Sequence, residues 1–185
     1  DLHVVRLLEH AGELEADASI HVIVVTGAGE RAFVAGGDIA DLDSRQGLAH
    51  YEAFAEVIHR VFRRFETSDK PTIGAINGWA LGGGMELLLT LDLRYVANEA
   101  KLGLPEITLG LFPGAGGSQR IMREIAPCRA RELMFTGESI TASEAVSLGL
   151  CNQAVPRSQL MTVVLDVAKR IAGKSNRSTS VMPNM

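Results

Sequence analysis

Hydrophobic and polar positions along the chain predict short strands separated by helices. Apolar residues recur at helical spacing in Leu2 to Asp17 and Tyr51 to Thr67, where they would form one buried face. The β-branched run His21 to Val25 predicts a buried strand, and the glycine-rich segment Gly27 to Asp38 predicts a loop. This alternation is typical of an α/β domain. The same pattern predicts strands at Pro71–Ile76 and Leu93–Ala97 and helices at Met85–Leu91, Ala115–Ile125, Arg129–Phe135, Ala142–Leu148 and Gln159–Ala172.

Two segments need separate interpretation. The longest apolar stretch, Ile73 to Leu91, contains five glycines together with Asn77 and Glu86, which argues against a membrane span and favours a buried strand, turn and helix. The polar segment after Lys174 has no apolar period. We therefore expect one core domain over residues 1–175 and a disordered or non-native tail over residues 176–185.

Composition narrows the functional classes. The chain has 185 residues, of which 46% are hydrophobic and 22% charged, enough for one domain with a sizeable core. Its net charge of −4 and the absence of a basic run give no electrostatic case for nucleic-acid binding. Two cysteines match neither a metal pattern nor a disulfide framework, so we expect a reducing, cytoplasmic environment. No signal peptide is visible, and the start at Asp1 suggests a cut edge.

The glycine-rich centre of the chain contains the first candidate catalytic group. All five histidines lie within the first 59 residues, so any chemistry at the centre proceeds without a neighbouring histidine in sequence. Glu86 lies in the almost wholly apolar segment Gly82 to Leu89. Burial would raise the pKa of this carboxyl and make it a general acid or base near neutral pH. Alternatively, Glu86 is a first-turn carboxylate that complements the helix dipole.

Two further features extend this candidate site. The glycines that precede Glu86 would place backbone N–H groups at a helix N-terminus, where they could stabilise an oxyanion of a thioester or ester. The alternative is a tight packing turn. Glu106 is a second glutamate in apolar surroundings, and the two carboxyls could form an acid–base pair if the fold brings them together. The alternative for Glu106 is an ion-paired residue at the end of a strand or loop.

Two other motifs are weaker. Gly27 to Ala32 fits the dinucleotide-binding pattern G-x-G-x-x-A, but the residues that follow favour no helix, as that motif requires. Ser118 follows a double glycine without a histidine near it in sequence. A nucleophilic role for Ser118 would need His50 or His59 to be brought close by the fold, which the sequence disfavours without excluding.

Several segments match, in order, the motifs of one known family. They are Phe33–Ile39, Lys70–Pro71, Asn77–Leu87, Leu104–Glu106, Gly110–Arg120, Thr136–Glu138, Ala142–Ala145 and Gly149–Leu150. Together they resemble the enoyl-CoA hydratase/isomerase (crotonase) superfamily over about Leu2 to Lys174. The resemblance implies a crotonase-like α/β spiral of repeated ββα units, commonly assembled as a homotrimer or a dimer of trimers. It also implies an acyl-CoA thioester substrate and no metal or redox cofactor.

The resemblance also implies roles for individual residues. Glu86 would activate the water that adds to the β-carbon, and Glu106 would deliver a proton to the α-carbon. The backbone N–H groups of Ala35 and Gly83 would hold the thioester oxygen, and Gly114 would help to hold the water. The positions implied in substrate or CoA binding are Arg31, Ala32, Phe33, Ala35, Gly36, Asp38, Ile39, Gly82, Gly83 and Pro113.

The presence of both glutamates favours an enoyl-CoA hydratase over other members of the superfamily. An isomerase, a carnitinyl-CoA dehydratase and a non-catalytic acyl-CoA-binding subunit remain alternatives. The N-terminal strands and C-terminal helices usual in the family have no counterpart here, so we expect a domain truncated at both ends. Membrane association is not expected.

Overall fold

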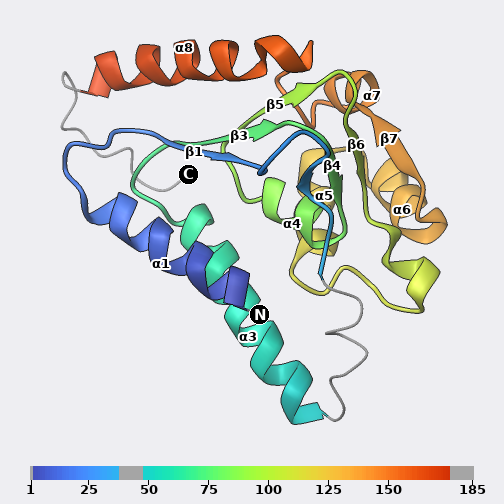
Figure 1. The fold of residues 1–185 in the computed structure, drawn as a ribbon. Helices are drawn as coiled ribbons and strands as arrows, with labels where there is room; N and C mark the ends of the chain where they lie inside the picture. The colour runs from blue at the N-terminus through green and yellow to red at the C-terminus, as the bar shows by residue number, and fades with distance from the viewer. Residues whose placement is uncertain (1, 38–47, 176–185) are drawn as a thin grey trace.

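The first six strands alternate between two four-stranded sheets, and the last two join the second and then the first sheet (Figure 1). The computed structural model describes residues 2–37 and 48–175. The first sheet is parallel and contains, in spatial order, β1 (Ile23–Thr26), β3 (Thr72–Ile76), β5 (Leu93–Ala97) and β8 (Gln153–Val155). The second contains β2 (Ala32–Val34), β4 (Trp79–Leu81), β6 (Lys101–Gly103) and β7 (Ser139–Thr141), of which only β7 is antiparallel to its neighbour.

This alternation produces the repeated ββα units that the family resemblance implies. In each repeat, one strand joins the first sheet, the next joins the second sheet, and a helical segment follows. The helical segments are α3 (Leu48–Glu66) in the first repeat, α4 (Gly83–Leu88) in the second, and η1 (Pro105–Leu109), α5 (Gly117–Glu124) and α6 (Pro127–Thr136) in the third. The chain continues through β7, α7 (Ala142–Ser147), β8 and α8 (Arg157–Ser175).

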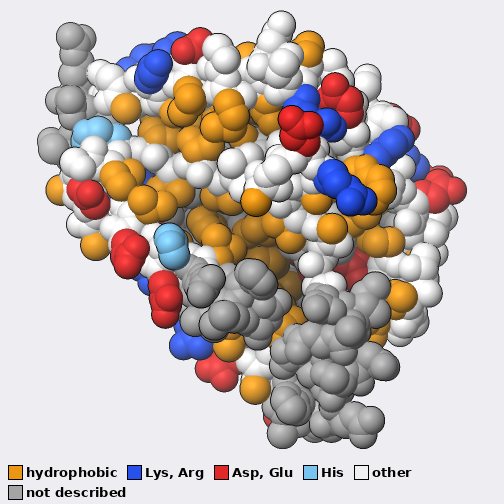
Figure 2. Space-filling view, viewed as in Figure 1, with side chains coloured by type: hydrophobic (Ala, Val, Ile, Leu, Met, Phe, Trp, Pro, Cys, Tyr) orange, Lys and Arg blue, Asp and Glu red, His pale blue; other side chains and the backbone are white. Residues whose placement is uncertain are grey.

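Helices cover the first sheet on opposite sides (Figure 1). Helix α8 packs on one face, where Ile73 and Ala75 of β3 meet Val164 in one apolar cluster. The pair formed by α1 (Leu2–Ala16) and α3 lies on the other side and contributes to the main core. Figure 2 shows hydrophobic side chains gathered between α1 and α8, where β1 is the outer strand of the described sheet.

The structure confirms the longer predicted elements and corrects the shorter ones. A capping box begins α7, because Thr141 Oγ1 accepts the Glu144 N–H and Glu144 Oε2 accepts the Thr141 N–H. The prediction of a continuous loop over Gly27 to Asp38 was wrong, since residues 32–34 form β2. Strands β4, β6, β7 and β8 were also missed. Each has only three residues, too few to display an alternating pattern.

The strand and the helix predicted within residues 73–91 are present as β3 and α4, and the turn predicted between them contains the short strand β4. Within residues 2–37 and 48–175, we find no helix that combines the length and the apolar character required to cross a bilayer.

Candidate active site

The candidate site lies at one edge of the second sheet, where three neighbouring parallel strands end. Ala35 and Gly36 follow β2, Gly82 and Gly83 follow β4, and Glu106 follows β6. Ligand sites in parallel sheets commonly lie at this edge, beyond the carboxyl ends of the strands. Parallel pairing of β2, β4 and β6 therefore brings together groups that are far apart in sequence.

Close approaches between these strand ends confirm that they are adjacent. The Gly82 N–H donates to the Gly103 carbonyl at 3.0 Å. A β-carbon added to Gly82 would lie 3.3 Å from Glu106 Oε1 and 3.9 Å from the Gly36 α-carbon. Gly82 has a φ of +54°, a left-handed conformation that favours glycine. The turn after β4 therefore lies between the end of β2 and the Glu106 carboxyl.

Glu86 is the most deeply buried carboxyl of this site. It lies in the first turn of α4 with only 4% of its surface exposed. Its Oε1 accepts the N–H groups of Ala115 and Gly117, both at 2.8 Å. The side chain is thus directed to the segment before α5, which lies beside α4 (Figure 1). A role limited to complementing the dipole of its own helix does not account for these contacts.

The surroundings of Glu86 shift its titration toward neutral pH. Burial, with a smaller contribution from the negative charge of Glu106, raises the pKa of this carboxyl to about 7. The Gly117 and Ala115 N–H groups act in the opposite direction by stabilising the carboxylate. Both protonation states of Glu86 are therefore populated near pH 7, which suits a general acid or base.

Glu106 is half-buried at the start of η1, and its environment differs from that of Glu86. Burial raises the pKa of this carboxyl also. Its Oε2 is buried without a hydrogen-bond partner, and the described residues contain no ion pair to it. The alternative of an ion-paired glutamate is therefore not supported within the described part of the chain. Two neighbouring carboxyls repel each other when both are ionised. Such a pair favours a state in which one carboxyl keeps a proton that it can exchange with a substrate.

The remaining predicted positions have different surroundings. Ala35 is exposed just after β2, and Gly83 is the first residue of α4, with open space where a side chain would begin. The first N–H groups of a helix have no intrahelical acceptor. Gly114 is exposed, whereas Pro113 is buried; both lie in the segment that leads to Ala115.

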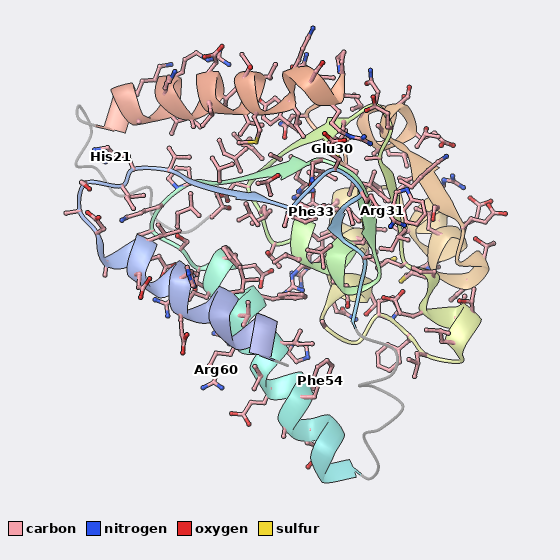
Figure 3. The ribbon with its side chains drawn as sticks, in the orientation of Figure 1. His21, Glu30, Arg31, Phe33, Phe54 and Arg60 are labelled. Atoms are coloured by element: carbon pink, nitrogen blue, oxygen red, sulfur yellow. The ribbon has the colours of Figure 1, made fainter. Side chains whose placement is uncertain are left out.

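The predicted CoA-contacting loop is only partly described. Arg31 is exposed, whereas the Phe33 side chain is 4% exposed and belongs to the main core, in the interior of the molecule (Figure 3). The side chain of Phe33 is therefore not available to a ligand. Ala32 is half-buried, and Gly36 has a φ of +104°. Asp38 and Ile39 lie outside the described residues.

The weaker motifs find no support in the structure. Gly27 to Ala32 leads into β2 instead of a helix, which excludes the dinucleotide-binding arrangement. Ser118 lies in α5, whereas His59 of α3 lines a hollow of about 760 Å³ together with Glu15 and Arg60. That hollow is broad, but neither Glu86 nor Glu106 lines it. In the described ranges, no cluster of three or more His, Cys, Asp or Glu side chains could hold a metal ion.

Three contacts at or near the candidate site were not anticipated from the sequence. They are the N–H donors of Ala115 and Gly117 to Glu86, and the link from Arg120 to Glu66. The double glycine at the start of α5 was visible in the sequence. It gave no indication that the N–H groups around it face a carboxylate 31 positions earlier.

Glycine is required at position 117 because of Glu86. A β-carbon added there would lie 2.6 Å from Glu86 Cγ and 2.9 Å from its Oε1. We expect Gly117→Ala to lower the free energy of unfolding by about 1–3 kcal/mol, because the buried carboxyl must move. Urea unfolding at pH 7 would measure this. Gly173→Ala is the matched control, since its added β-carbon meets nothing within 4 Å. Equal stabilities of the two variants would contradict the prediction.

Known proteins with similar sequences match most of the chain. Residues 6–184 match the sequence profile of the enoyl-CoA hydratase/isomerase family. The chain is 40% identical over 164 residues to a short-chain-enoyl-CoA hydratase of Clostridium acetobutylicum, covering 89% of this chain and 62% of that protein. It is 41% identical over 158 residues to a crotonyl-CoA hydratase of Syntrophomonas wolfei, covering 85% and 60%. The chain thus spans about three-fifths of the length of these curated relatives.

The fold agrees with the same assignment. The crystal structure of an enoyl-CoA hydratase from Bacillus anthracis superposes with a TM-score of 0.87 at 39% identity, covering 91% of this chain and 65% of that one. The α/β spiral of ββα units is therefore the crotonase fold that the sequence predicted. With a profile match over nearly its whole length and this fold, the chain belongs to the enoyl-CoA hydratase/isomerase family.

Proposed function

We propose that this chain catalyses the reversible addition of water to trans-2-enoyl-CoA thioesters. The observation that carries the proposal is the position of Glu86 and Glu106 at the same sheet edge as the main chain of Ala35 and Gly83. The names of the two relatives, a short-chain-enoyl-CoA hydratase and a crotonyl-CoA hydratase, support the same reaction.

In the proposed reaction, each group has a defined task. The Glu86 carboxylate accepts a proton from water while the water oxygen forms a bond to the β-carbon. The electron pair of the carbon–carbon double bond moves toward the thioester carbonyl, whose oxygen becomes negative. The N–H groups of Ala35 and Gly83 stabilise this charge. Protonated Glu106 then donates its proton to the α-carbon, which gives the 3-hydroxyacyl thioester.

The titration of the carboxyls supports a reaction that runs in both directions. Hydration needs Glu86 ionised and Glu106 protonated, and dehydration needs the opposite state. Because the pKa of Glu86 is about 7, both of its protonation states are populated near neutral pH, and burial raises the pKa of Glu106 in the same direction. The Ala115 and Gly117 N–H groups favour the ionised Glu86 that the hydration direction requires.

The proposal extends to binding and assembly. We assign the segment from Arg31 to Gly36, which contains β2, to contacts with the CoA portion of the substrate. The acid–base chemistry is assigned entirely to the chain's own groups, so activity should persist in EDTA. We also propose a cytoplasmic homotrimer or dimer of trimers as the working form. Light scattering of the purified protein would measure the assembly.

Glu106→Gln tests the proton-donor role. We expect the hydration rate of crotonyl-CoA, followed as loss of the enoyl-thioester absorbance, to fall about 10²–10⁴-fold, because a glutamine cannot deliver the proton. Glu13→Gln is the matched control, since Glu13 is exposed on α1. A Glu106→Gln variant with unchanged rate would contradict the assigned role.

Product analysis of the same reaction distinguishes the alternatives. Formation of 3-hydroxybutyryl-CoA supports the proposal. Migration of the double bond in a longer enoyl-CoA without water addition would identify an isomerase. Preferential turnover of carnitinyl-CoA would identify the corresponding dehydratase. Tight acyl-CoA binding without turnover in any of these assays would identify a non-catalytic binding subunit.

A further inference from the structure

We propose that Arg120 is a positioning residue that clamps the turn from Ala115 to Gly117 against α3 and thereby fixes the Glu86 carboxylate for catalysis. This inference rests on the proposed function for its kinetic consequence only, since the contacts of Arg120 stand without it. Arg120 itself does not touch the proposed substrate.

The guanidinium of Arg120 is held on two sides. Its Nε and Nη2 donate to Glu66 Oε1 and Oε2 at 2.7 and 2.8 Å, a two-bond ion pair between α5 and the end of α3. Its Nη1 donates to the Ala115 carbonyl at 2.8 Å. The Arg120 side chain is only 12% exposed, and its guanidinium carbon lies 5.9 Å from the ring centroid of Phe62. Such a planar, largely buried fork has little freedom to move.

The clamped turn is the one that holds Glu86. The Ala115 carbonyl accepts from Arg120, while the Ala115 and Gly117 N–H groups donate to Glu86 Oε1. Between them, Gly116 has a φ of +100°, and a β-carbon on it would lie 2.4 Å from Arg120 Nη1. The absence of a side chain at Gly116 therefore allows the guanidinium to lie against the turn. One end of this network is the ion pair of Arg120 with the more exposed Glu66, and the other end is the buried Glu86 carboxyl.

The positive charge of Arg120, like its contact with the turn, favours the ionised form of Glu86. The positive charge of Arg120 lowers the pKa of Glu86, opposing the effects of burial and of Glu106. Among the described residues, Glu106 and Arg120 are the charged side chains that act on Glu86. The hydrogen bond from Arg120 also lowers the pKa of Glu66, as expected for a strong pair. Removal of Arg120 should both loosen the turn and favour protonated Glu86.

Four variants separate these effects. Arg120→Gln removes the charge and the clamp, and Arg120→Lys keeps the charge but cannot form the two-bond fork and reach the Ala115 carbonyl together. Glu66→Gln removes the anchor on α3. Arg64→Gln is the matched control, because it breaks another ion pair of α3, to Glu15 at 2.7 Å, away from the site. Thermal unfolding would establish that each variant is folded.

Two measurements follow for each variant. The first is the pH dependence of kcat and KM for crotonyl-CoA hydration. The second is the titration of the Glu86 carboxyl by ¹³C NMR in the unliganded protein, with the signal assigned by its loss in Glu86→Gln. The second measurement needs no activity, so it distinguishes failure of this inference from failure of the proposed function.

We expect Arg120→Gln to lower kcat at pH 7 about 10–100-fold, with KM changed less than about threefold, and to move the Glu86 titration to higher pH. Arg120→Lys should lose a similar factor in kcat with a smaller displacement of the titration. Glu66→Gln should lower kcat, and Arg64→Gln should resemble the wild type. A folded Arg120→Gln or Arg120→Lys variant with kcat within twofold of wild type and an unchanged Glu86 titration would overturn the inference. If the wild type lacks hydratase activity, the Glu86 titrations of the folded variants alone test the inference, and an unchanged titration in Arg120→Gln would overturn it.

Discussion

Glu86→Gln should reduce the rate of crotonyl-CoA hydration by about 10²–10⁴-fold, because glutamine cannot accept the proton of the attacking water. The substitution keeps the shape of the side chain, and its carbonyl oxygen can still accept the Ala115 and Gly117 N–H groups. Substrate binding should therefore change little. Steady-state kcat and KM at pH 7 would measure the effect, and a variant that keeps a tenth or more of wild-type kcat would exclude Glu86 as the base.

The same substitution has an opposite effect on stability. In the folded chain, the pKa of Glu86 is about 7 instead of the ordinary 4.5, so the folded state binds this proton more tightly than the unfolded state. Glu86 thus lowers the free energy of unfolding progressively as the pH rises from about 4.5 to 7. A difference of this size corresponds to roughly 3 kcal/mol above pH 7.

The stability of Glu86→Gln relative to wild type should therefore increase with pH across this window and level off above it. Urea unfolding at several pH values between 4 and 8.5 would measure the difference. A difference that is independent of pH would show that the carboxyl is not held at a raised pKa. Together with the loss of activity, a gain in stability would identify Glu86 as a group kept at the site for function.

Gly84→Ala is the second substitution with a large expected effect. A β-carbon at this position would lie 1.8 Å from the Val34 carbonyl oxygen and 2.7 Å from the carbonyl carbon. These are main-chain atoms of β2, so no rotation of a side chain can relieve the overlap. Helix α4 and strand β2 would have to separate within the core. We expect a loss of about 3 kcal/mol or more in the free energy of unfolding.

Gly83→Ala provides the matched control for stability. It lies next to Gly84 in the same helix, but its added β-carbon meets nothing within 4 Å. Since alanine favours helix more than glycine, Gly83→Ala should be as stable as wild type or slightly more stable. Urea unfolding of both variants would measure the contrast. If Gly84→Ala lost less than about 1 kcal/mol, the close packing of α4 on β2 would not be required.

The sequence indicated the chemistry of the site better than its geometry. Glu86 stood out because a carboxyl within an apolar helix is rarely buried without a purpose. Its proximity to Glu106, twenty positions away, depends on the parallel pairing of β4 with β6, two strands of three residues each. No periodicity in so few residues could reveal that pairing.

Contacts across long separations were the least accessible from sequence. Arg120 and Glu66 are 54 positions apart, and both are residues that commonly lie on solvated helix faces. Phe33 was assigned to a ligand-binding loop because of its neighbours in the motif, but its side chain fills the core. The motif did not reveal that this residue lies in β2, whose packing determines the direction of the side chain.

The alternation of strands between two sheets distributes the proposed reaction over successive repeats. The first repeat supplies one N–H donor at Ala35, the second supplies Gly83 and Glu86, and the third supplies Glu106. Each contribution follows a different strand of one sheet, so a change after one strand need not disturb the others. A substitution at Glu106 alone would leave the oxyanion-binding groups and one base in place. The spiral therefore places each group of the proposed reaction on a separate segment, so that one group can be exchanged while the others keep their positions.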